Sequence, residues 1–562
     1  MSDTKINRQR AMILAAEKKS RGARYRAYTK LSGPGWLQGA ITLGGGSLAG
    51  SLYLGIIGGY ELMWLQPLMM IFGVVMLSAI AYVTLSTGER PFDALNQHVS
   101  PVLGWGWAIA TLMANLVWAM PQFSLGTAAL RQNLGILSFS GGEYICALLL
   151  IAIGVYGVWL YDSSSKGYKV FDVALKFMVG VIVVSFFLVG VVLSTGERGL
   201  PWGRILAGFI PNPGLIFEPA SSLAGLVAQS SNAEFWHSEI VSAQRDRIVA
   251  AAATAVGINM TFLLPYSLMK RRWDRNFRGL ARFDLSIGLF VPFLIATSCV
   301  VIAASTQFHA NPEPGLIEVH RSGAVEAPAQ LQAAYEANLT KMMAHSGQEA
   351  TPALMGALPE ADRMLAATLI QRDAFALANS LENLAGAGFS QIVFGIGVVG
   401  MAVSTIIILM LINGFVICEM AGRPTTGNLY RAGCFLPALT GAFGALFLWS
   451  GKAQFYLAVP TSRFGMVLLP IAYLAFFLLM NNKKLLGDDL PKGASRTRWN
   501  LMMIIALLLS LSGAAISILN DKAVFPGTDL AVRHVGLTVL GLLFLWGLIW
   551  HFRRERSAGA AN

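Results

Sequence analysis

Long runs of apolar residues, separated by short polar stretches, recur along almost the whole chain. A run of about 20 residues is long enough to cross the ~30 Å hydrocarbon core of a bilayer as a helix. The pattern therefore predicts an all-α integral membrane protein. The clear runs lie near residues 35–58, 62–86, 104–130, 143–161, 170–195, 283–306, 385–415, 433–450, 455–481, 499–519 and 534–552.

The stretch between the fifth and seventh spans holds two candidates for a sixth span, a polar-flecked one at 219–243 and a smoother one at 248–269. Basic residues decide how many times the chain crosses here, because cytoplasmic loops carry an excess of Lys and Arg. All basic loops fall on one side only if a single net crossing precedes Lys270. We expect about twelve helices with both termini cytoplasmic, in a bacterial inner (plasma) membrane. The loops in question carry Lys166 and Lys169, Lys270 to Arg278, Lys483 to Arg498, and Arg553 to Arg556.

The polar segments give the domain organisation. Residues 1–33 carry nine basic and two acidic residues and no signal-peptide pattern, which predicts a basic cytoplasmic arm. The arm is either an amphipathic helix on anionic lipid or a disordered topology signal. A transmembrane domain is expected at 34–552, followed by a cytoplasmic tail at 553–562. Within the domain we expect outside loops at 196–218 and 307–384 and a cytoplasmic-side insertion at 244–282.

Composition and charge exclude several classes of function. Of the 562 residues, 55% are hydrophobic and 13% are charged, about half the charged fraction of a soluble domain. The net charge of +12 lies in loops, where it sets topology and predicts no nucleic-acid partner. The four cysteines have no CxxC spacing and are expected to be buried small hydrophobes. Without HExxH, GxSxG or P-loop motifs, we expect no enzyme and no cofactor.

Breaks in membrane helices point to a site, because a helix that loses backbone hydrogen bonds at mid-depth must line a cavity or be buried in protein. The first span contains Gly44, Gly45, Gly46 and Ser47 near its middle. Each glycine disfavours a helix interior by about 1 kcal/mol relative to Ala. The cluster predicts either a local break or close helix packing. Gln38 and Thr42 lie one to two turns away on the same span.

The first candidate for the sixth span contains a polar cluster at its middle, which favours a break followed by a second half-helix. The second candidate contains Pro265, which removes one backbone donor. Paired breaks in the first and sixth spans would indicate an inverted-repeat transporter with a site at the membrane midplane. The polar cluster consists of Gln229, Ser230, Ser231 and Asn232.

Four short segments resemble the NRAMP family of divalent metal-ion transporters: GPG at Gly33, GGYELMW at Gly58, AEFWHSEIV at Ala233 and VSTIIILMLINGFVICEMAG at Val403. The resemblance implies the LeuT-type fold, with two inverted five-helix units plus two accessory helices. It favours 219–243 as the sixth span, because His237 followed by Ser238 matches the histidine and serine of the family's sixth helix.

The residues that bind metal in the family are missing from the matched positions. The family's Asp-Pro-Gly-Asn motif falls on Gly44 to Ser47, and its Met-Pro-His motif falls on Ser230 to Asn232. In the third helix, Met120 and Phe123 stand where the family carries acidic residues. Hydroxyls and one amide do not compensate a dehydrated dication, so we expect no metal site. Glu234 can reach the break along the helix; it is expected to pair with His237 or else to ligate metal.

The resemblance and these departures together predict a secondary transporter that moves a small neutral, zwitterionic or anionic solute by alternating access. The first alternative is the family's divalent metal-ion transport, with Mn, Fe or a hydrated Mg-like ion. The second is a non-transporting receptor or assembly protein. Asp172, four residues before Lys176, is expected to form a structural ion pair. The expected partners are the substrate and the lipid bilayer.

Overall fold

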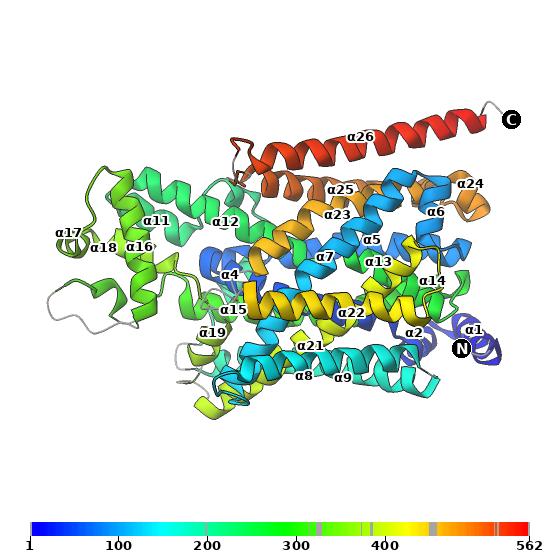
Figure 1. Ribbon diagram of the computed structural model, residues 1–562, viewed down its shortest axis with the longest axis horizontal. Coiled ribbons are helices and arrows are strands. Elements are labelled where there is room, and N and C mark those ends of the chain that lie inside the picture. Colours follow the sequence, from blue (N-terminus) through cyan, green and yellow to red (C-terminus); the bar gives the residue numbers. More distant parts are fainter. Residues whose placement is uncertain are drawn as a thin grey trace.

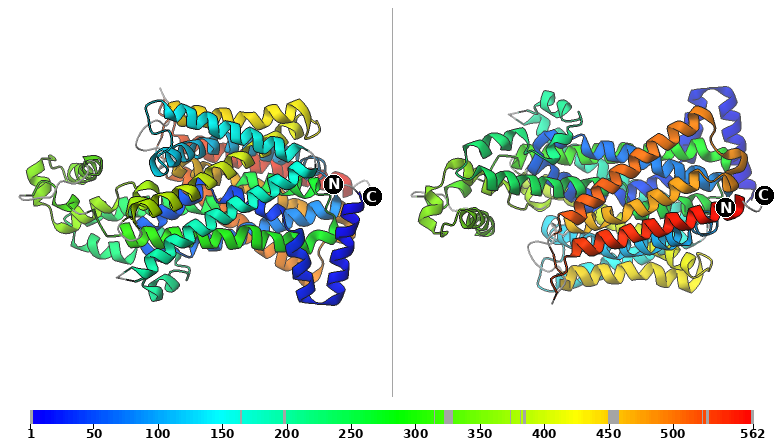
Figure 2. Two further views of the ribbon diagram at one scale, coloured as in Figure 1. Left: turned by 90° about the horizontal axis from the view of Figure 1, so that it is seen from below. Right: turned by 90° about the horizontal axis from the view of Figure 1, so that it is seen from above.

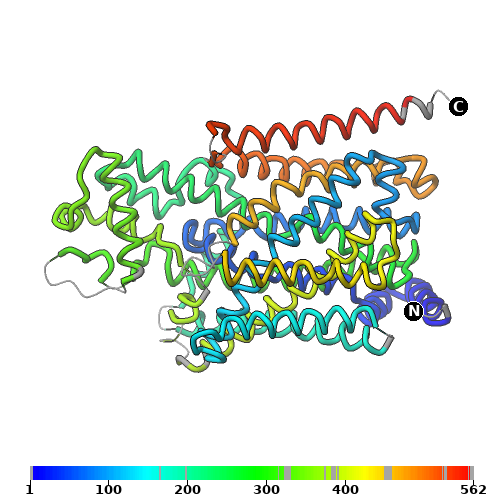
Figure 3. The backbone as a smooth tube through the Cα atoms, in the orientation of Figure 1, coloured from blue at the N-terminus to red at the C-terminus, as the bar shows by residue number. Residues whose placement is uncertain are grey.

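The computed structural model describes residues 3–559, except 164, 197–198, 314, 322–328, 373, 381, 383–385, 449–457, 522 and 525–527. Within these residues the chain is helical and has no strand beyond one bridge between Val524 and Ala531. Long helices run roughly side by side along the long axis of the molecule (Figures 1 and 3). In the described part of the chain, eleven helices are long and apolar enough to cross a membrane, and one bent pair makes twelve. The predicted all-α membrane fold is confirmed.

The spanning helices are α3 (Pro34–Thr42) with α4 (Gly45–Gly58), α5 (Leu65–Thr87), α7 (Pro101–Ala128) extended by η2 (Ala129–Asn133), α8 (Gly142–Asp162), α9 (Ser165–Thr195), α12 (Ala233–Ala255) with α13 (Ile258–Lys270), α14 (Arg278–Leu285) with η5 (Ser286–Phe290) and α15 (Val291–Phe308), α21 (Ala387–Met420), α22 (Gly427–Phe443) with η7 (Gly444–Leu448), α23 (Ala458–Met480), α25 (Gly493–Leu519) and α26 (Val532–Gly559). The shorter helices are α1 (Asp3–Lys19), α2 (Arg21–Leu31), η1 (Gly59–Leu62), α6 (Pro91–His98), α10 (Trp202–Ala207), η3 (Pro213–Ile216), α11 (Ser221–Gln229), η4 (Arg275–Phe277), η6 (Leu316–Glu318), α16 (Ala329–His345), α17 (Pro352–Ala357), α18 (Glu360–Thr368), α19 (Ala374–Ser380), α24 (Lys483–Leu486) and η8 (Gly487–Asp489).

The two ends of the molecule differ. Both chain ends lie together at one end of the bundle, which we call the termini end (Figure 1). At the opposite end, α11, α16, α17 and α18 form a separate lobe, which we call the cap (Figure 1). An apolar cluster that includes Leu54, Leu223 and Tyr335 joins the cap to the bundle. Each spanning helix therefore has one end toward the cap and one toward the termini.

Two spanning helices are interrupted. α3 ends at Thr42 and α4 begins at Gly45, and the two halves are bent by 53°, so the predicted break in the first span is confirmed. α12 ends at Ala255 and α13 begins at Ile258, with extended backbone at the two residues between them. The interrupted spans are the first and the sixth. Each is the first of five consecutive spans, and the two sets of five form the LeuT-type inverted repeat. The two accessory helices are α25 and α26.

The expected position of the sixth span is wrong. Residues 233–270 form one candidate span of 38 residues, almost wholly buried, so the apolar stretch at 248–269 crosses the bundle and is not a cytoplasmic-side insertion. The polar cluster at 229–232 does interrupt a helix, since α11 ends at Gln229 and α12 begins at Ala233. That interruption lies in the cap. The cause of the error is the length of α12, which runs without a break from the cap into the bundle.

Candidate functional site

The two helix breaks meet at a small cavity inside the bundle. Its volume is about 50 Å³, enough for a few water molecules or a solute of a few heavy atoms. Five spans surround it: the interrupted first and sixth spans together with α7, α21 and α23. The lining residues are Ile41, Thr42, Gly44, Gly46, Ser47, Trp118, Pro121, Gln122, Ala253, Thr254, Gly257, Asn259, Met260, Thr405, Leu409, Thr461 and Ser462.

Neighbouring side chains form hydrogen bonds with some of the backbone groups that lose their helical partners at the first break. The Gly45 amide donates to Gln122 Oε1 at 2.9 Å, and Ser404 Oγ donates to the Ala40 carbonyl at 3.0 Å. The first amides of a helix have no partner within the helix, so those of Gly46 and Ser47, which line the cavity, lie at the positive end of α4. The start of α4 can therefore bind a hydrogen-bond acceptor.

A thioether links the two breaks. Met260 Sδ lies 3.1 Å from Thr42 Oγ1 and 3.4 Å from the amide of Gly257. Gly257 also has to be small, because a Cβ there would lie 2.5 Å from the Trp118 ring. These contacts fix the start of α13 against the end of α3, so that the two interrupted spans share one wall of the cavity.

Two buried amide side chains near the breaks have no hydrogen-bond partner among the described residues. Asn259 is 1% exposed and lines the cavity, and neither its Oδ1 nor its Nδ2 is partnered. Gln38, one turn before Thr42, is fully buried and also has both amide atoms unpartnered. A buried polar group without a partner costs about 1–3 kcal/mol. Asn259 therefore presents a free donor and a free acceptor to whatever enters the cavity.

The cavity is electrically neutral. Its lining consists of apolar side chains, hydroxyls, two amides, one thioether and glycine backbone. Among the described residues, no group of three or more His, Cys, Asp or Glu could hold a metal ion. Manganese and iron(II) are usually bound with carboxylate or imidazole ligands. The ligands available here suit a polar, uncharged guest better than a dehydrated dication.

The structure brings together only the part of the predicted site that lies on the first span. Thr42, Gly44, Gly46 and Ser47 line the cavity, and Gly45 adjoins it through its bond to Gln122. Gln38 is buried nearby without lining it. The six predicted residues of the other group lie at the end of α11 and the cap end of α12: Gln229, Ser230, Ser231, Asn232, Glu234 and His237.

Hydrogen bonds hold this second group in the cap. Asn232 Nδ2 donates to Ser346 Oγ at 2.9 Å, and the Ser231 amide donates to Asp362 Oδ2 at 2.9 Å. Asn232 and Ala253 lie at opposite ends of one continuous helix, about 30 Å apart at 1.5 Å per residue. The second group of predicted residues therefore does not line the cavity, and the prediction that it does is wrong.

The expected pair of Glu234 and His237 is also wrong. His237 Nε2 lies 3.1 Å from Glu218 Oε2, and Glu234 is exposed. Both residues lie in the first turns of α12, at its cap end. Neither lines the cavity, so Glu234 supplies no metal ligand there.

Sequence reasoning missed the cavity residues of the later spans, among them Gln122, Asn259, Met260 and Thr405. The signal for Asn259 and Met260 was present in the second candidate for the sixth span, where Gly257 precedes two polar residues in an otherwise apolar run. Pro265, the feature considered there, lies inside α13. In the third span, Met120 and Phe123 face the glycines at 441 and 444 on the α22 side, so this packed face is apolar.

A charged network fastens the start of α3 to neighbouring helices at the termini end. Asp284 accepts from the amides of Gly33 at 2.9 Å and Gly35 at 2.6 Å. Arg271 donates to the Leu31 carbonyl and to Asp172. The predicted ion pair of Asp172 with Lys176 is confirmed at 2.8 Å. An anion at a helix N-terminus is favourable, so Asp284 fastens α3 to α14.

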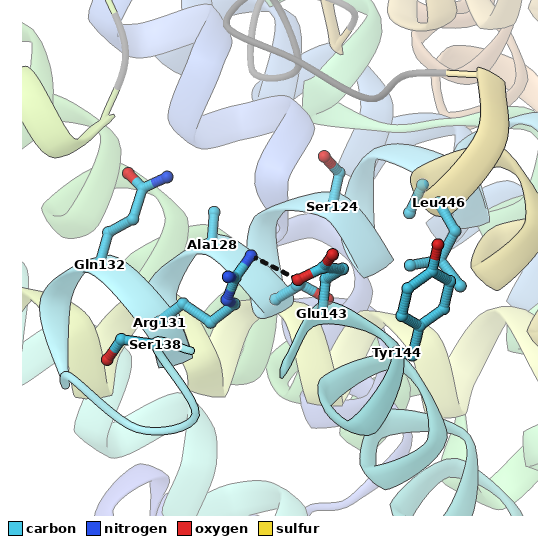
Figure 4. A pocket seen from close by; sticks show the side chains of 10 residues that line it. Ser124, Ala128, Arg131, Gln132, Ser138, Glu143, Tyr144 and Leu446 are labelled. Atoms are coloured by element: carbon cyan, nitrogen blue, oxygen red, sulfur yellow. Dashed lines mark ion pairs between the residues drawn. The ribbon is translucent and has the colours of Figure 1, made fainter. Parts of the chain in front are cut away.

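A second and larger hollow, of about 620 Å³, lies beside α7, α8 and η7 (Figure 4). Its wall contains the ion pair of Arg131 with Glu143, at 3.0 Å (Figure 4). The same guanidinium donates to the carbonyls of Leu137 and Phe139. Arg131 therefore stabilises the loop between η2 and α8, and its hydrogen-bond donors are used mainly by that loop and not by a ligand in the hollow. The cavity at the breaks remains the candidate site.

Comparison with known proteins agrees with this architecture. The model of the natural resistance-associated macrophage protein-like (Nramp) family matches residues 35–342 and 362–519. Among curated proteins, none matches the sequence. A solved structure of the Eremococcus coleocola manganese transporter, a histidine-to-alanine mutant, has a TM-score of 0.65 at 14% identity, covering 94% of this chain and 96% of that one.

The same transporter in complex with an aromatic bis-isothiourea substituted compound gives a TM-score of 0.63 at 15% identity, again covering 94% and 96% of the two chains. At this identity the likeness shows the fold alone, whereas the family match spans most of the sequence. The segment that the family model skips, 343–361, lies in the cap and includes α17. The chain therefore belongs to the Nramp family of metal-ion transporters, and it is a multi-pass membrane transporter, not an enzyme.

Proposed function

We propose that the chain carries a small polar solute, neutral, zwitterionic or anionic, and binds it in the cavity between the two helix breaks. The observation that supports this proposal is the neutral lining of the cavity, in which amides, hydroxyls and helix-end amides occur without an acidic or imidazole group among the described lining residues. In a family of metal-ion transporters, such a site indicates a changed substrate.

The hydrogen-bonding capacity of the cavity favours a guest with acceptors and donors. The Asn259 amide offers both, and the Gly46 and Ser47 amides at the start of α4 add donors. The hydroxyl of Ser47 donates to the Gly44 carbonyl at 2.9 Å, which leaves its lone pairs to accept from the guest. A cation would satisfy the Asn259 carbonyl and leave the amide hydrogens facing a positive charge.

For the direction of the chain in the membrane, we place the termini end in the cytoplasm. Lys and Arg are concentrated in the loops at this end, as the positive-inside rule requires. In the conformation described, α3 is fastened to α14 at the termini end by Asp284. Alternating access then requires this contact to open while the cap side closes, by rocking of one set of helices against the other.

Uptake into vesicles reconstituted with the full-length protein tests the site. Asn259→Ala and Ser47→Ala should each lower uptake of the carried solute at least tenfold, because each removes a group of the cavity wall. Asn232→Ala is the matched control, since the same residue type is changed in the cap, and its uptake should equal that of the wild type. Loss of uptake in Asn232→Ala together with normal uptake in Asn259→Ala would reject the assignment.

Cation transport is the second candidate, and the neighbouring Asn259 Oδ1 and Met260 Sδ favour it. Backbone carbonyls freed at the two breaks could add ligands to a partly hydrated ion. A cation that binds the folded protein at 100 times its Kd adds about 2.7 kcal/mol to the free energy of unfolding. Saturable stabilisation by Mg²⁺ or Mn²⁺ that disappears in Asn259→Ala would favour this candidate over the solute.

A further inference from the structure

We infer that the helical hairpin of α1 and α2 binds the headgroups of anionic phospholipids at the membrane surface. This inference does not depend on which substrate the cavity carries. It draws on the position of the hairpin in the fold, on its charge, and on the way in which its apolar residues are used.

The hairpin is a folded unit docked on the termini end of the bundle. Arg10 forms an ion pair with Asp274 beside η4, with 2.6 Å between Arg10 Nη2 and Asp274 Oδ2. In α2, the ring of Tyr28 is 4% exposed and lies 5.6 Å from the ring of Phe283 in α14. The Tyr28 hydroxyl donates to Glu17 Oε1 at 3.2 Å. These contacts fix α1 to the loop between α13 and α14, and α2 to α14 itself.

The hairpin lies at the depth of the membrane surface. In both views of Figure 2, α1 and α2 run across the long axis of the bundle, and the turn between them projects beyond the neighbouring spans. The spans cross the membrane along that long axis. Helices that lie across it at the termini end are therefore close to the plane of the lipid headgroups.

The charge of the hairpin is complementary to anionic lipid. Residues 1–33 contain nine Lys and Arg and two acids, and one of those acids, Glu17, is bonded to Tyr28. Lys18, Lys19 and Arg21, which flank the projecting turn, are all exposed. Each basic residue near an anionic membrane surface raises affinity about fivefold. Three such residues at one turn therefore supply a factor on the order of 100.

Charge supplies the main attraction to the lipid. Three apolar residues of α1, Ile6, Ile13 and Ala16, are buried, whereas Met12, Leu14 and Tyr25 of the hairpin are exposed. The hairpin is therefore packed on itself and on the bundle, and it presents a basic surface with a few apolar side chains. Such binding weakens with salt, because the Debye length shortens from about 10 Å at 0.1 M to about 3 Å at 1 M.

The hairpin is joined to the contact between Asp284 and the start of α3, which we call the gate. α2 ends at Leu31, whose carbonyl accepts from Arg271 Nη1, and α3 begins three residues later. Any lipid that holds the hairpin in place also restrains the start of α3, the helix that Asp284 fastens to α14.

Hydrogen–deuterium exchange of the full-length protein in nanodiscs tests the inference. Amides of residues 3–31 should exchange several-fold more slowly in phosphatidylcholine mixed with phosphatidylglycerol than in phosphatidylcholine alone, and 1 M salt should abolish the difference. The triple variant Lys18→Gln, Lys19→Gln, Arg21→Gln should lose the difference. Nanodiscs expose both faces of the protein, so the result does not depend on its orientation in the cell.

A matched triple variant at the cap end controls for total charge. Arg204→Gln, Arg321→Gln, Lys341→Gln removes three exposed basic residues and should keep the wild-type response. In pure phosphatidylcholine, the hairpin variant should exchange like the wild type, which shows that its hairpin still folds. Equal exchange of the wild type in the two lipid mixtures, or lipid protection that survives in the hairpin variant, would overturn the inference.

Discussion

At the scale of single residues, hydrogen-bond partners distinguish two asparagines on the sixth span. Asn232 is saturated: its Oδ1 accepts from the Phe235 amide at 3.1 Å and its Nδ2 donates to Ser346. It is a helix cap. Asn259 is more deeply buried and has neither atom partnered among the described residues. A ligand that satisfies Asn259 recovers the cost of leaving it unpaired, which is why we assign substrate contact to this one.

A second residue-scale feature is His309, which joins three elements near the cap. Its Nδ1 donates to the Ile56 carbonyl of α4 at 2.8 Å, and its Nε2 contacts Ser222 Oγ of α11. Glu61 and Arg204 are the charged groups that act on it. Burial lowers the pKa of His309 below its ordinary value of 6.5, whereas the Ile56 carbonyl and Glu61 raise it. The folded protein therefore favours the neutral ring.

The sign of the pH dependence follows from the lowered pKa. Stability contributed by neutral His309 is fully present above pH 6.5 and is lost as the pH falls through its lower value in the folded state. The melting temperature of the wild type should thus fall between pH 7 and pH 5 by more than that of His309→Gln. Parallel pH profiles for the two proteins would contradict this role.

The residue scale is also where sequence reasoning is weakest. The sequence predicted the break beside Thr42, Gly44, Gly46 and Ser47, because a run of glycines within an apolar helix marks a break without reference to any neighbour. Asn259 carries no such local mark. Its importance comes from missing partners and from the distant Gln122 and Thr405, which the fold alone brings to the same cavity.

At the scale of elements, α3 packs backbone to backbone against α14 and η5. A Cβ on Gly35 would lie 2.1 Å from the Asp284 carbonyl oxygen, and one on Gly39 would lie 2.1 Å from that of Gly288. Small residues allow such close approach of membrane helices. The glycines of the first span therefore do both things that the sequence suggested, since some break the helix and others pack it.

Gly39→Ala should push α3 away from η5, because a backbone carbonyl cannot move aside cheaply. Overpacking of this kind costs about 1–3 kcal/mol and should shift the gate toward opening at the termini end. The expected result is faster labelling of Thr42→Cys by a thiol reagent added at that face.

Gly180→Ala in α9 is the control, because an added Cβ there meets nothing within 4 Å. Its labelling rate should match that of the Thr42→Cys parent. If Gly39→Ala and Gly180→Ala label at the same rate, the contact between α3 and η5 is not the gate.

Element boundaries were predicted well wherever hydropathy alone sets them. The exception is the sixth span, where two breaks lie on one continuous stretch and the more polar of them is in the cap. Polar residues at 229–232 mark a helix end equally well in water and in protein, so their composition could not give their depth. The position of this segment follows from its contacts in the folded protein, because Asp362 and Ser346 of the cap bind it.

At the scale of the whole molecule, the chain has the architecture of the Nramp family, and we propose that its central cavity takes a different substrate. The inverted repeat brings the two breaks together, and the family match extends over most of the chain. The low charged fraction of the sequence predicted a membrane protein directly. It also predicted a neutral site for a partly wrong reason, since one of the two motif positions inspected lies in the cap and the thioether of Met260 is present at the cavity after all.

The central claim is that this cavity does not bind a transition-metal dication. Titration of Mn²⁺ into the purified full-length protein, followed by calorimetry, tests the claim most directly. We expect no saturable binding to the wild type or to Asn259→Ala. Micromolar Mn²⁺ binding to the wild type that is lost in Asn259→Ala, while Asn232→Ala retains it, would contradict this claim and make the cavity a metal site.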